Sequence, residues 1–207
     1  MSSSSSVNAE VLLSQALAGS RDCFGRLLHR HRNYLKLLVV SQLEQKLQRR
    51  VSASDVVQET FLEANRDFPK FRGTSRGEFS AWLRRILVNN LHRVVEQHVL
   101  AAKRDVRREV TLEQLASSLE KSTARLETIL PDPGTSPSGS AQQHEMEIAL
   151  ADHLAELPAD YRNVIVLRHI ECLSFEAIGE QLDRSSGAAR MLWLRAIQAL
   201  RERMNPK

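Results

Sequence analysis

The chain has 207 residues, enough for one domain or two small ones, and its hydrophobic content of 42% excludes wholesale disorder. Aromatic residues make up only 5%, and Gly and Pro are few, which favours a helical protein. The net charge is +4, and no apolar run approaches the length that spans a bilayer, so membrane insertion is not expected.

The N-terminal segment "MSSSSSVNAE" has no apolar core of the kind found in signal peptides. We expect residues 1–7 to form a disordered tail. Cys23 and Cys172 lie far apart in segments with apolar periodicity, and we expect both to be reduced residues of the core. Reduced cysteines predict a cytoplasmic protein.

Hydrophobic residues recur with a spacing near 3.6 along most of the chain, and the alternation typical of strands is absent. The spacing therefore predicts an all-α fold. The expected helices cover residues 8–18, 21–30, 32–48, 53–67, 77–98, 111–130, 145–155, 158–171, 174–182 and 185–203. Residues 131–143 are rich in Pro, Gly and Ser without large apolar side chains, which is typical of an interdomain linker.

These elements predict two small helical domains joined by a flexible linker. The expected divisions are the tail at 1–7, an N-terminal domain at 8–100, a linker at 101–143 and a C-terminal domain at 144–207. The linker contains an amphipathic helix at 111–130, for which Thr111 and Gln114 form a potential capping box. The apolar stripe of this helix either docks on its own domain or joins two copies of the chain.

The helix at 53–67 carries an acidic stripe, because Asp55, Glu59 and Glu63 fall at i, i+4 and i+8. Ser52 is a candidate N-cap, and Asp55 in the first turn also interacts favourably with the helix dipole. Glu59 and Glu63 gain nothing from the dipole, and neither has a basic residue four positions on. The stripe is therefore available to a basic partner.

Positive charge is concentrated in residues 69–108, which hold ten Lys and Arg against three acidic residues. This segment has a net charge of +7, and the rest of the chain has −3. Such a block favours binding of a polyanion, although a solvated helix face is the alternative. The stretch "FPKFRGTSRGEF" within it is predicted as a loop, because Pro69, Gly73 and Gly77 interrupt any helix.

The C-terminal residues 173–204 show the pattern of two helices joined by a short polar turn. Ser174 can cap the first helix, whose inward positions are Phe175, Ile178 and Leu182, and the second helix turns Ala189, Trp193, Ala196 and Leu200 to one face. Gly179 in mid-helix costs about 1 kcal/mol relative to alanine, which is understandable where the second helix crosses closely. The pattern predicts a helix-turn-helix, with an ordinary helical hairpin as the alternative.

The opposite face of the second helix combines small residues with arginines. Its members are Arg184, Ser186, Gly187, Arg190, Met191, Leu194 and Arg195. Small residues let the backbone approach the major groove, and arginine side chains reach phosphates or guanine edges. This face is expected to contact duplex DNA.

Two long stretches resemble bacterial RNA polymerase sigma factors of the extracytoplasmic-function type. The sequences "DVVQETFLEANRDFPKFRG" and "FSAWLRRILVNNLHRVV" resemble the second region of these factors, and "ALADHLAELPADYRNVIVLRHIECLSFEAIGEQL" resembles the fourth. The resemblance covers roughly residues 20–100 and 145–203, in the same order and with a similar tether. It implies a factor that binds core RNA polymerase, recognises promoter DNA and helps to melt it.

The resemblance also implies roles for individual residues. Binding of the polymerase clamp helices falls on Asp55, Gln58, Glu59 and Glu63. A pocket for a flipped base of the minus-ten element falls on Phe71, Arg72, Gly73, Thr74, Ser75 and Arg76, with Arg84, Arg85, Asn89 and Arg93 along the adjacent DNA path. Contacts to the minus-thirty-five element fall on Arg184, Ser185, Ser186, Gly187, Ala188, Arg190, Met191 and Arg195.

Two features depart from the family pattern, and one residue allows two interpretations. The recognition helix has "ARMLWLR" where family members commonly present a polar, basic run, and the turn has Asp183 where glycine is common. Trp82 either packs in the core or stacks on the melted strand.

No enzyme or cofactor site is expected, because the sequence contains neither an HExxH motif nor a glycine-rich phosphate loop. The resemblance allows an anti-sigma factor as a further partner. The principal alternative is a two-domain regulator that binds an operator without being a polymerase subunit, and a third reading is an adaptor that binds only proteins.

Overall fold

The computed structural model describes residues 3–43, 51–101, 111–127, 129 and 140–204, and within these ranges the chain forms helices and no strands. The elements are α1 (Ser3–Leu17), α2 (Arg21–Arg30), α3 (Arg32–Gln42), α5 (Ala53–Asp67), η1 (Phe68–Lys70), α6 (Arg76–Ala101), α7 (Leu112–Glu127), α8 (Ser140–Glu156), α9 (Ala159–Ile165), η2 (Val166–Ile170), α10 (Phe175–Leu182) and α11 (Ser186–Met204). The predicted all-α class is confirmed.

Several element boundaries differ from those expected from periodicity. Helix α1 begins at Ser3, inside the segment expected as a disordered tail, and α8 begins at Ser140, inside the expected linker. Both extensions are polar sequences that lack an apolar period but continue the backbone hydrogen bonding of the adjoining helix. The expectations for 1–2, 44–48, 102–110, 128 and 130–139 lie outside the described residues.

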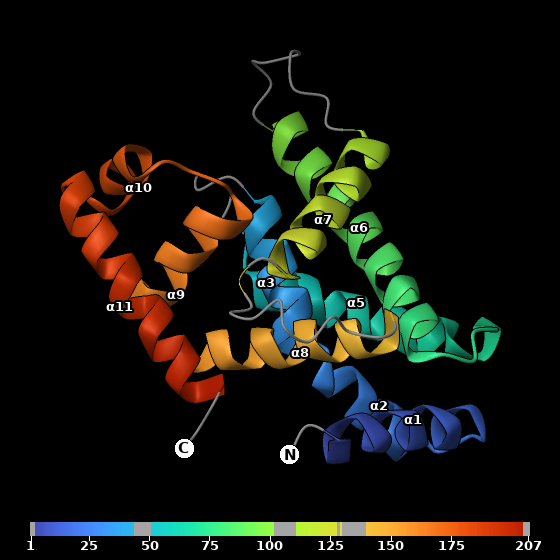
Figure 1. The fold of residues 1–207 in the computed structure, drawn as a ribbon. Coiled ribbons are helices and arrows are strands. Elements are labelled where there is room, and N and C mark those ends of the chain that lie inside the picture. Colours follow the sequence, from blue (N-terminus) through green and yellow to red (C-terminus); the bar gives the residue numbers. More distant parts are fainter. Residues whose placement is uncertain (1–2, 44–50, 102–110, 128, 130–139, 205–207) are drawn as a thin grey trace.

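The buried apolar side chains form two clusters. The smaller one joins α1 and α2 to α5 and α6, and comprises Leu12, Leu13, Ala16, Cys23, Phe24, Leu27, Leu28, Ala64, Phe79, Leu83 and Ile86. The larger one runs without interruption from α3, α5 and α6 through α7 and α8 to α11. The two predicted domains therefore share one apolar cluster, and α3, α7 and α8 lie side by side where they meet (Figure 1).

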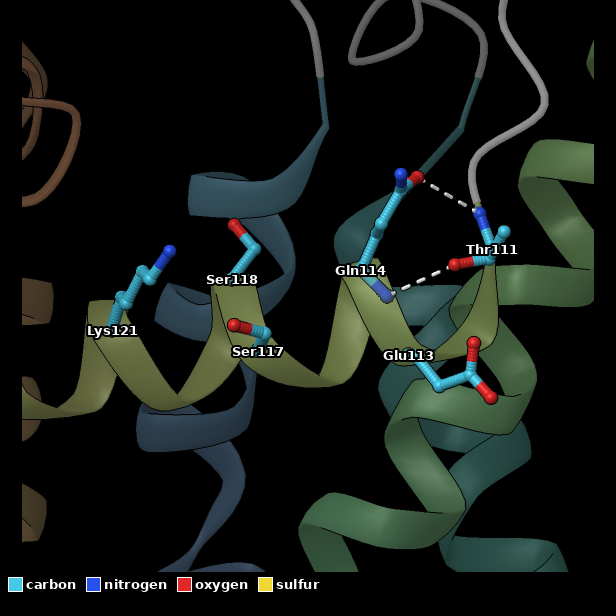
Figure 2. A pocket seen from close by; sticks show the side chains of 6 residues that line it. All are labelled: Thr111, Glu113, Gln114, Ser117, Ser118 and Lys121. Atoms are coloured by element: carbon cyan, nitrogen blue, oxygen red, sulfur yellow. Dashed lines mark hydrogen bonds between the residues drawn. The ribbon is translucent and has the colours of Figure 1, made fainter.

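Helix α7 begins with the predicted capping box. The Gln114 backbone N–H donates to Thr111 Oγ1 at 3.2 Å, and the Thr111 N–H donates to Gln114 Oε1 at 3.1 Å (Figure 2). Of its apolar stripe, Leu115, Leu119, Leu126 and Ile129 are buried, whereas Leu112 is 43% exposed. The stripe packs on α3 and α6 and also on α8 and η2, so this helix docks on both halves of the chain.

The two cysteines have different environments. Cys23 is buried in the smaller cluster, as expected, but Cys172 is exposed. The expectation for Cys172 was wrong because the residue lies in the connection between η2 and α10, where its backbone adopts a left-handed conformation with φ of 57°. Both thiols are free.

His31 lies between α2 and α3 and is only 3% exposed. Its Nδ1 is 2.8 Å from the Leu27 carbonyl oxygen, and its Nε2 is 2.8 Å from Ser80 Oγ. A neutral ring satisfies both partners, because Nδ1–H donates to Leu27 and Nε2 accepts from the serine hydroxyl. Burial, with weaker repulsion from His144 and two arginines, lowers the pKa of His31 from 6.5 to about 4.

This histidine should make the stability of the fold sensitive to acid. The unfolded chain protonates His31 near pH 6.5, whereas the folded chain protonates it only near its lowered pKa of about 4. The free energy of unfolding is therefore highest above pH 6.5 and decreases as the pH falls from 6.5 toward 4. We expect the free energy of unfolding to fall by about 2 kcal/mol between pH 7 and pH 5 through this residue. Urea unfolding of the wild type and His31→Asn at both pH values measures it. Equal pH dependence in the two proteins would contradict the assignment.

Candidate nucleic-acid and protein interfaces

Helix α5 turns an acidic face to solvent. It starts at Ser52, whose Oγ accepts from the Asp55 N–H at 3.4 Å, and its inward side buries Val56, Val57, Thr60 and Ala64. Asp55, Gln58 and Glu59 are exposed on the other side. Leu62 is 62% exposed beside them, one turn after Glu59. The face thus combines carboxylates with one large apolar side chain.

Glu63 does not belong to this open face. Its carboxylate forms an ion pair with Arg93 of α6 and accepts a hydrogen bond from Asn90 Nδ2 at 3.3 Å, and its side chain is 14% exposed. The stripe was expected to be available to a basic partner, but Glu63 already pairs with Arg93, which lies thirty positions away in sequence and approaches only in the folded chain. Two residues expected to bind different partners therefore hold α5 and α6 together.

The loop after η1 lies on a cluster of aromatic rings. The Phe71 ring is 5.1 Å from that of Trp82, 5.8 Å from Phe79 and 5.9 Å from Phe68 between centroids. A Cβ on Gly73 would lie 2.4 Å from the Phe71 ring, so only glycine fits above it. Trp82 is half-buried within this cluster, which supports its reading as a packing residue.

The start of α6 is organised by Glu78. Its Oε2 accepts from the Thr74 and Ser75 backbone N–H groups at 2.9 Å and from Ser75 Oγ at 2.8 Å. Ser75 Oγ in turn accepts from the Glu78 N–H at 3.2 Å, which completes a capping box. These hydrogen bonds lower the pKa of Glu78. They fix the loop while leaving the side chain of Arg72 exposed.

Helix α6 divides the expected DNA-path residues between two faces. Arg85, Asn89 and Arg93 recur every four residues and are exposed in one stripe. Arg84 instead donates to the Tyr34 hydroxyl at 2.9 Å. Arg76, which the resemblance places in the base pocket, is ion-paired with Glu10 and Glu145. The expected continuous path is therefore reduced, in this arrangement, to the first stripe.

The C-terminal elements form the predicted helix-turn-helix. Asp183 caps α10 in the left-handed conformation, with φ of 55°, which a short polar side chain tolerates where glycine would be the usual choice. Helix α11 buries Ala189, Leu192, Ala196 and Leu200, whereas Trp193 is half-buried. Its other face is exposed, including Met191 at 51% and Leu194 at 45%. The side predicted for the core is buried or half-buried and the opposite side is exposed, whereas contact of the exposed side with DNA stays a prediction.

The start of α11 is held by side chains on both sides of the turn. Ser185 Oγ accepts from the Ala188 N–H at 3.2 Å, which makes it the N-cap. Arg184 is paired with Asp160 of α9 at 2.9 Å. Trp193 donates through Nε1 to His169 Nε2 at 3.0 Å, so η2 fixes the rotation of the helix about its axis.

Gly179 explains the tight turn of this motif. A Cβ there would lie 2.6 Å from the Arg184 carbonyl oxygen and 3.1 Å from the Ser186 nitrogen, so the turn packs directly on α10. We expect Gly179→Ala to destabilise the fold by about 2 kcal/mol, because backbone has to move. Gly187→Ala is the control, since nothing lies within 4 Å of its added Cβ. Thermal unfolding should separate the two variants, and equal melting temperatures would contradict the close packing.

Comparison with known proteins finds matches to two separate parts of the chain. A model of sigma-70 region 2 matches residues 28–99, and one of sigma-70 region 4 matches residues 148–200. The ECF RNA polymerase sigma-E factor of Haemophilus influenzae is 32% identical over 203 residues, which cover 96% of this chain and 98% of that protein. The chain belongs to the sigma-70 family of sigma factors, of the ECF type.

Two further relatives also align with this chain over nearly their whole length. The RNA polymerase sigma-H factor of Pseudomonas aeruginosa is 29% identical over 94% of this sigma factor and 93% of its own length. The ECF RNA polymerase sigma-E factor of Escherichia coli K12 is 27% identical over 95% of this sigma factor and 94% of its own length. The region 2 match includes the acidic face and the aromatic loop, and the region 4 match includes the helix-turn-helix.

Three side chains of this sigma factor gain importance only from the structure. Leu62 is a large apolar residue on the open side of α5, Glu78 organises the loop, and His169 positions Trp193. The Ser-x-x-Glu pattern before α6 was the available signal for Glu78. Leu62 and His169 had no such local signal, because their roles depend on which side of a helix is covered.

Within the described ranges of this sigma factor, no helix is long and apolar enough to cross a bilayer. The same ranges contain no group of three or more His, Cys, Asp or Glu side chains that could hold a metal ion.

Proposed function

We propose that this sigma factor binds core RNA polymerase through the acidic face of α5. Asp55, Gln58 and Glu59 supply exposed hydrogen-bond acceptors and charge, and Leu62 supplies an apolar contact among them. A desolvated apolar centre with a charged rim is typical of protein interfaces. Glu63 has a different role, which is to position Arg93.

The second part of the proposal is that the aromatic loop and the exposed stripe of α6 hold the melted minus-ten strand. The exposed Arg72 and Arg85 supply positive charge for phosphates, and Asn89 can hydrogen-bond a base or a phosphate. Arg93, on the same stripe, is held beside them by its ion pair with Glu63. The rings under the loop make a rigid support, because Phe71 packs on three others. A flipped base would then meet a preformed loop.

The third part assigns the minus-thirty-five element to the N-terminal half of α11. Ser186, Gly187 and Ala188 are small and exposed, which lets the helix enter the major groove, and Arg190 is exposed one turn later. Met191 offers an exposed apolar surface at a position where recognition helices commonly carry a polar side chain. Apolar side chains complement the thymine methyl group, so thymine is expected at the bases that face it.

The observation that carries the proposal is the separation of charge on the folded chain. Exposed carboxylates gather on α5, while exposed arginines gather on α6 and at the start of α11. A regulator that bound only an operator would need the helix-turn-helix but not the acidic face. The role is one of binding and not of catalysis, and it is carried out in the cytoplasm with the polymerase.

Reconstitution with sigma-free core polymerase tests this function. The purified chain should direct initiation from specific promoters, and mapping the start sites would reveal both elements. Stable binding to duplex DNA without core, and no stimulated transcription, would contradict the proposal and favour an operator-binding regulator.

A further inference from the structure

A pocket lined mainly by cationic side chains lies between α2, α3 and α8. Its volume is about 440 Å³, within the usual range for sites that bind small molecules. The lining residues are His29, Arg30, Arg32, Asn33, Lys36 and Asp152. None of them belongs to the surfaces proposed for polymerase or promoter DNA, so this cationic pocket is free to serve a different ligand.

Arg32 and Lys36 supply the positive charge of the cationic pocket. They are four residues apart on α3, so their side chains project from the same side of the helix. Within the part of the chain that the structure describes, neither of them forms an ion pair with a carboxylate. Arg30 differs, because its guanidinium is paired with Glu145. The charge available to a ligand therefore comes from α3.

The surroundings of Lys36 add further positive charge. Partial burial lowers the pKa of Lys36, and repulsion from Arg32 and from Arg162 of α9 lowers it further. Arg162 is held in place by donation to the Ala155 carbonyl oxygen at 3.2 Å. Like charges held close together cost free energy, and an anion placed among them removes that cost. The cationic pocket is therefore electrostatically suited to an anion.

Asp152 is the carboxylate among the six lining residues. Its Oδ1 accepts from Asn33 Nδ2 at 2.8 Å, which fixes the position of the side chain. Among the described residues, none donates to its second oxygen. A hydroxyl group on a ligand can donate to that oxygen. The pocket thus offers donors for an anionic group and an acceptor for a neighbouring hydroxyl, which is the combination that a sugar phosphate requires.

We propose that the cationic pocket binds a small polyphosphate anion, of the chemical class of nucleoside di- and triphosphates. Arg32 and Lys36 contact the phosphates, and Asp152 accepts from a sugar hydroxyl. Arginine binds phosphate oxygens in a fixed fork, and lysine acts as a point charge beside it. A pocket of this size holds a few phosphate groups, whereas a duplex backbone spreads its charges along an extended surface.

Titration calorimetry of the full chain, without polymerase or DNA, tests the site. The probes are inorganic tripolyphosphate, ATP, orthophosphate and adenosine, at low ionic strength and without divalent cations. Tripolyphosphate and ATP should each bind at a single site per chain. Orthophosphate should bind at least about tenfold more weakly, because it carries fewer charges, and adenosine should not bind. Absence of saturable binding of both polyphosphates below millimolar concentration would overturn the proposal.

Two substitutions locate the binding on α3. Arg32→Gln and Lys36→Gln should each weaken polyphosphate binding about tenfold, because each removes a charge-assisted hydrogen bond. Arg21→Gln is the matched control, with the same charge change at an exposed site of α2 about two turns before the pocket. Circular dichroism during thermal unfolding shows that each variant is folded. Equal losses in all three variants would indicate general attraction of an anion to a basic protein and would overturn the site.

Asp152→Asn distinguishes a nucleotide from an inorganic polyphosphate. The amide keeps an oxygen that accepts from Asn33 but removes the negative charge. Affinity for tripolyphosphate should therefore rise, whereas affinity for ATP should rise less, because the sugar hydroxyl loses a charged acceptor. An equal rise for both probes would overturn the role of Asp152 and assign the pocket to the phosphate chain alone.

A short DNA duplex is the last probe. Duplex binding that Arg32→Gln and Lys36→Gln abolish, together with no binding of tripolyphosphate, would overturn the proposal in favour of a nucleic-acid contact. Binding of tripolyphosphate that the duplex does not displace would support a small-anion site.

Discussion

Replacing Glu59 with lysine should weaken the affinity of this sigma factor for core polymerase about a hundredfold while leaving the fold intact. Glu59 is exposed on α5 beside Asp55 and Leu62, and the inward side of the helix packs without it. Removing one partner of an interfacial charge pair typically costs about 2–5 kcal/mol, and the reversed charge adds repulsion. The expected loss corresponds to roughly 3 kcal/mol, at 1.4 kcal/mol for each factor of ten.

The measurement is titration of labelled protein with core polymerase, together with urea unfolding of the free protein. Glu59 is a sharper test than Asp55, because Asp55 also lies in the first turn beside the Ser52 cap and supports the helix itself. Glu120→Lys is the matched control, with the same charge change on α7. A core affinity within twofold of the wild type would show that the acidic face is not the polymerase-binding surface.

Replacing Arg190 with alanine should weaken binding to the upstream promoter element by about 10–100-fold. Arg190 is exposed at the start of α11, next to the small residues that allow the backbone to approach DNA. A specific arginine contact to a base edge is worth about 1–3 kcal/mol. Core assembly should be unchanged, because the residue lies on a different helix from the acidic face.

The control for this variant lies on the same helix. Arg201 is also exposed and falls on the same side of α11, but it lies three turns further along. Loss of charge at Arg201 should therefore change affinity much less, since only the beginning of a recognition helix enters the groove. Competition binding with matched and scrambled upstream elements measures both variants. Equal losses would indicate general attraction to phosphate and not base recognition.

The features that the sequence predicted correctly are those that depend on near neighbours in the chain. Ser52, Ser174 and the Thr111–Gln114 pair cap the helices at which they were expected. The buried and exposed sides of α11 follow from its apolar period. Gly179 packs closely on the turn, because no other residue fits beside the backbone there.

The pairing of charged groups was decided by tertiary structure alone. Glu63 meets Arg93, and Arg76 meets Glu145, across separations that no local pattern encodes. Three of these four residues, Glu63, Arg93 and Arg76, are ones that the family resemblance treats as surface contacts for other molecules. An opposite charge stabilises a partly buried charged side chain more than an exposed one, because removing an unpaired charge from water costs free energy.

By itself, the sequence determined the helical class, the order of the elements and the helix-turn-helix, because helix period, caps and turns are set by residues a few positions apart. Only the tertiary structure decided which faces stay open. In the folded chain Arg84 donates to the Tyr34 hydroxyl, Cys172 is exposed, and α7 packs against both halves of the chain. The physical reason is that burial depends on surfaces brought together from distant parts of the chain, which no local spacing specifies.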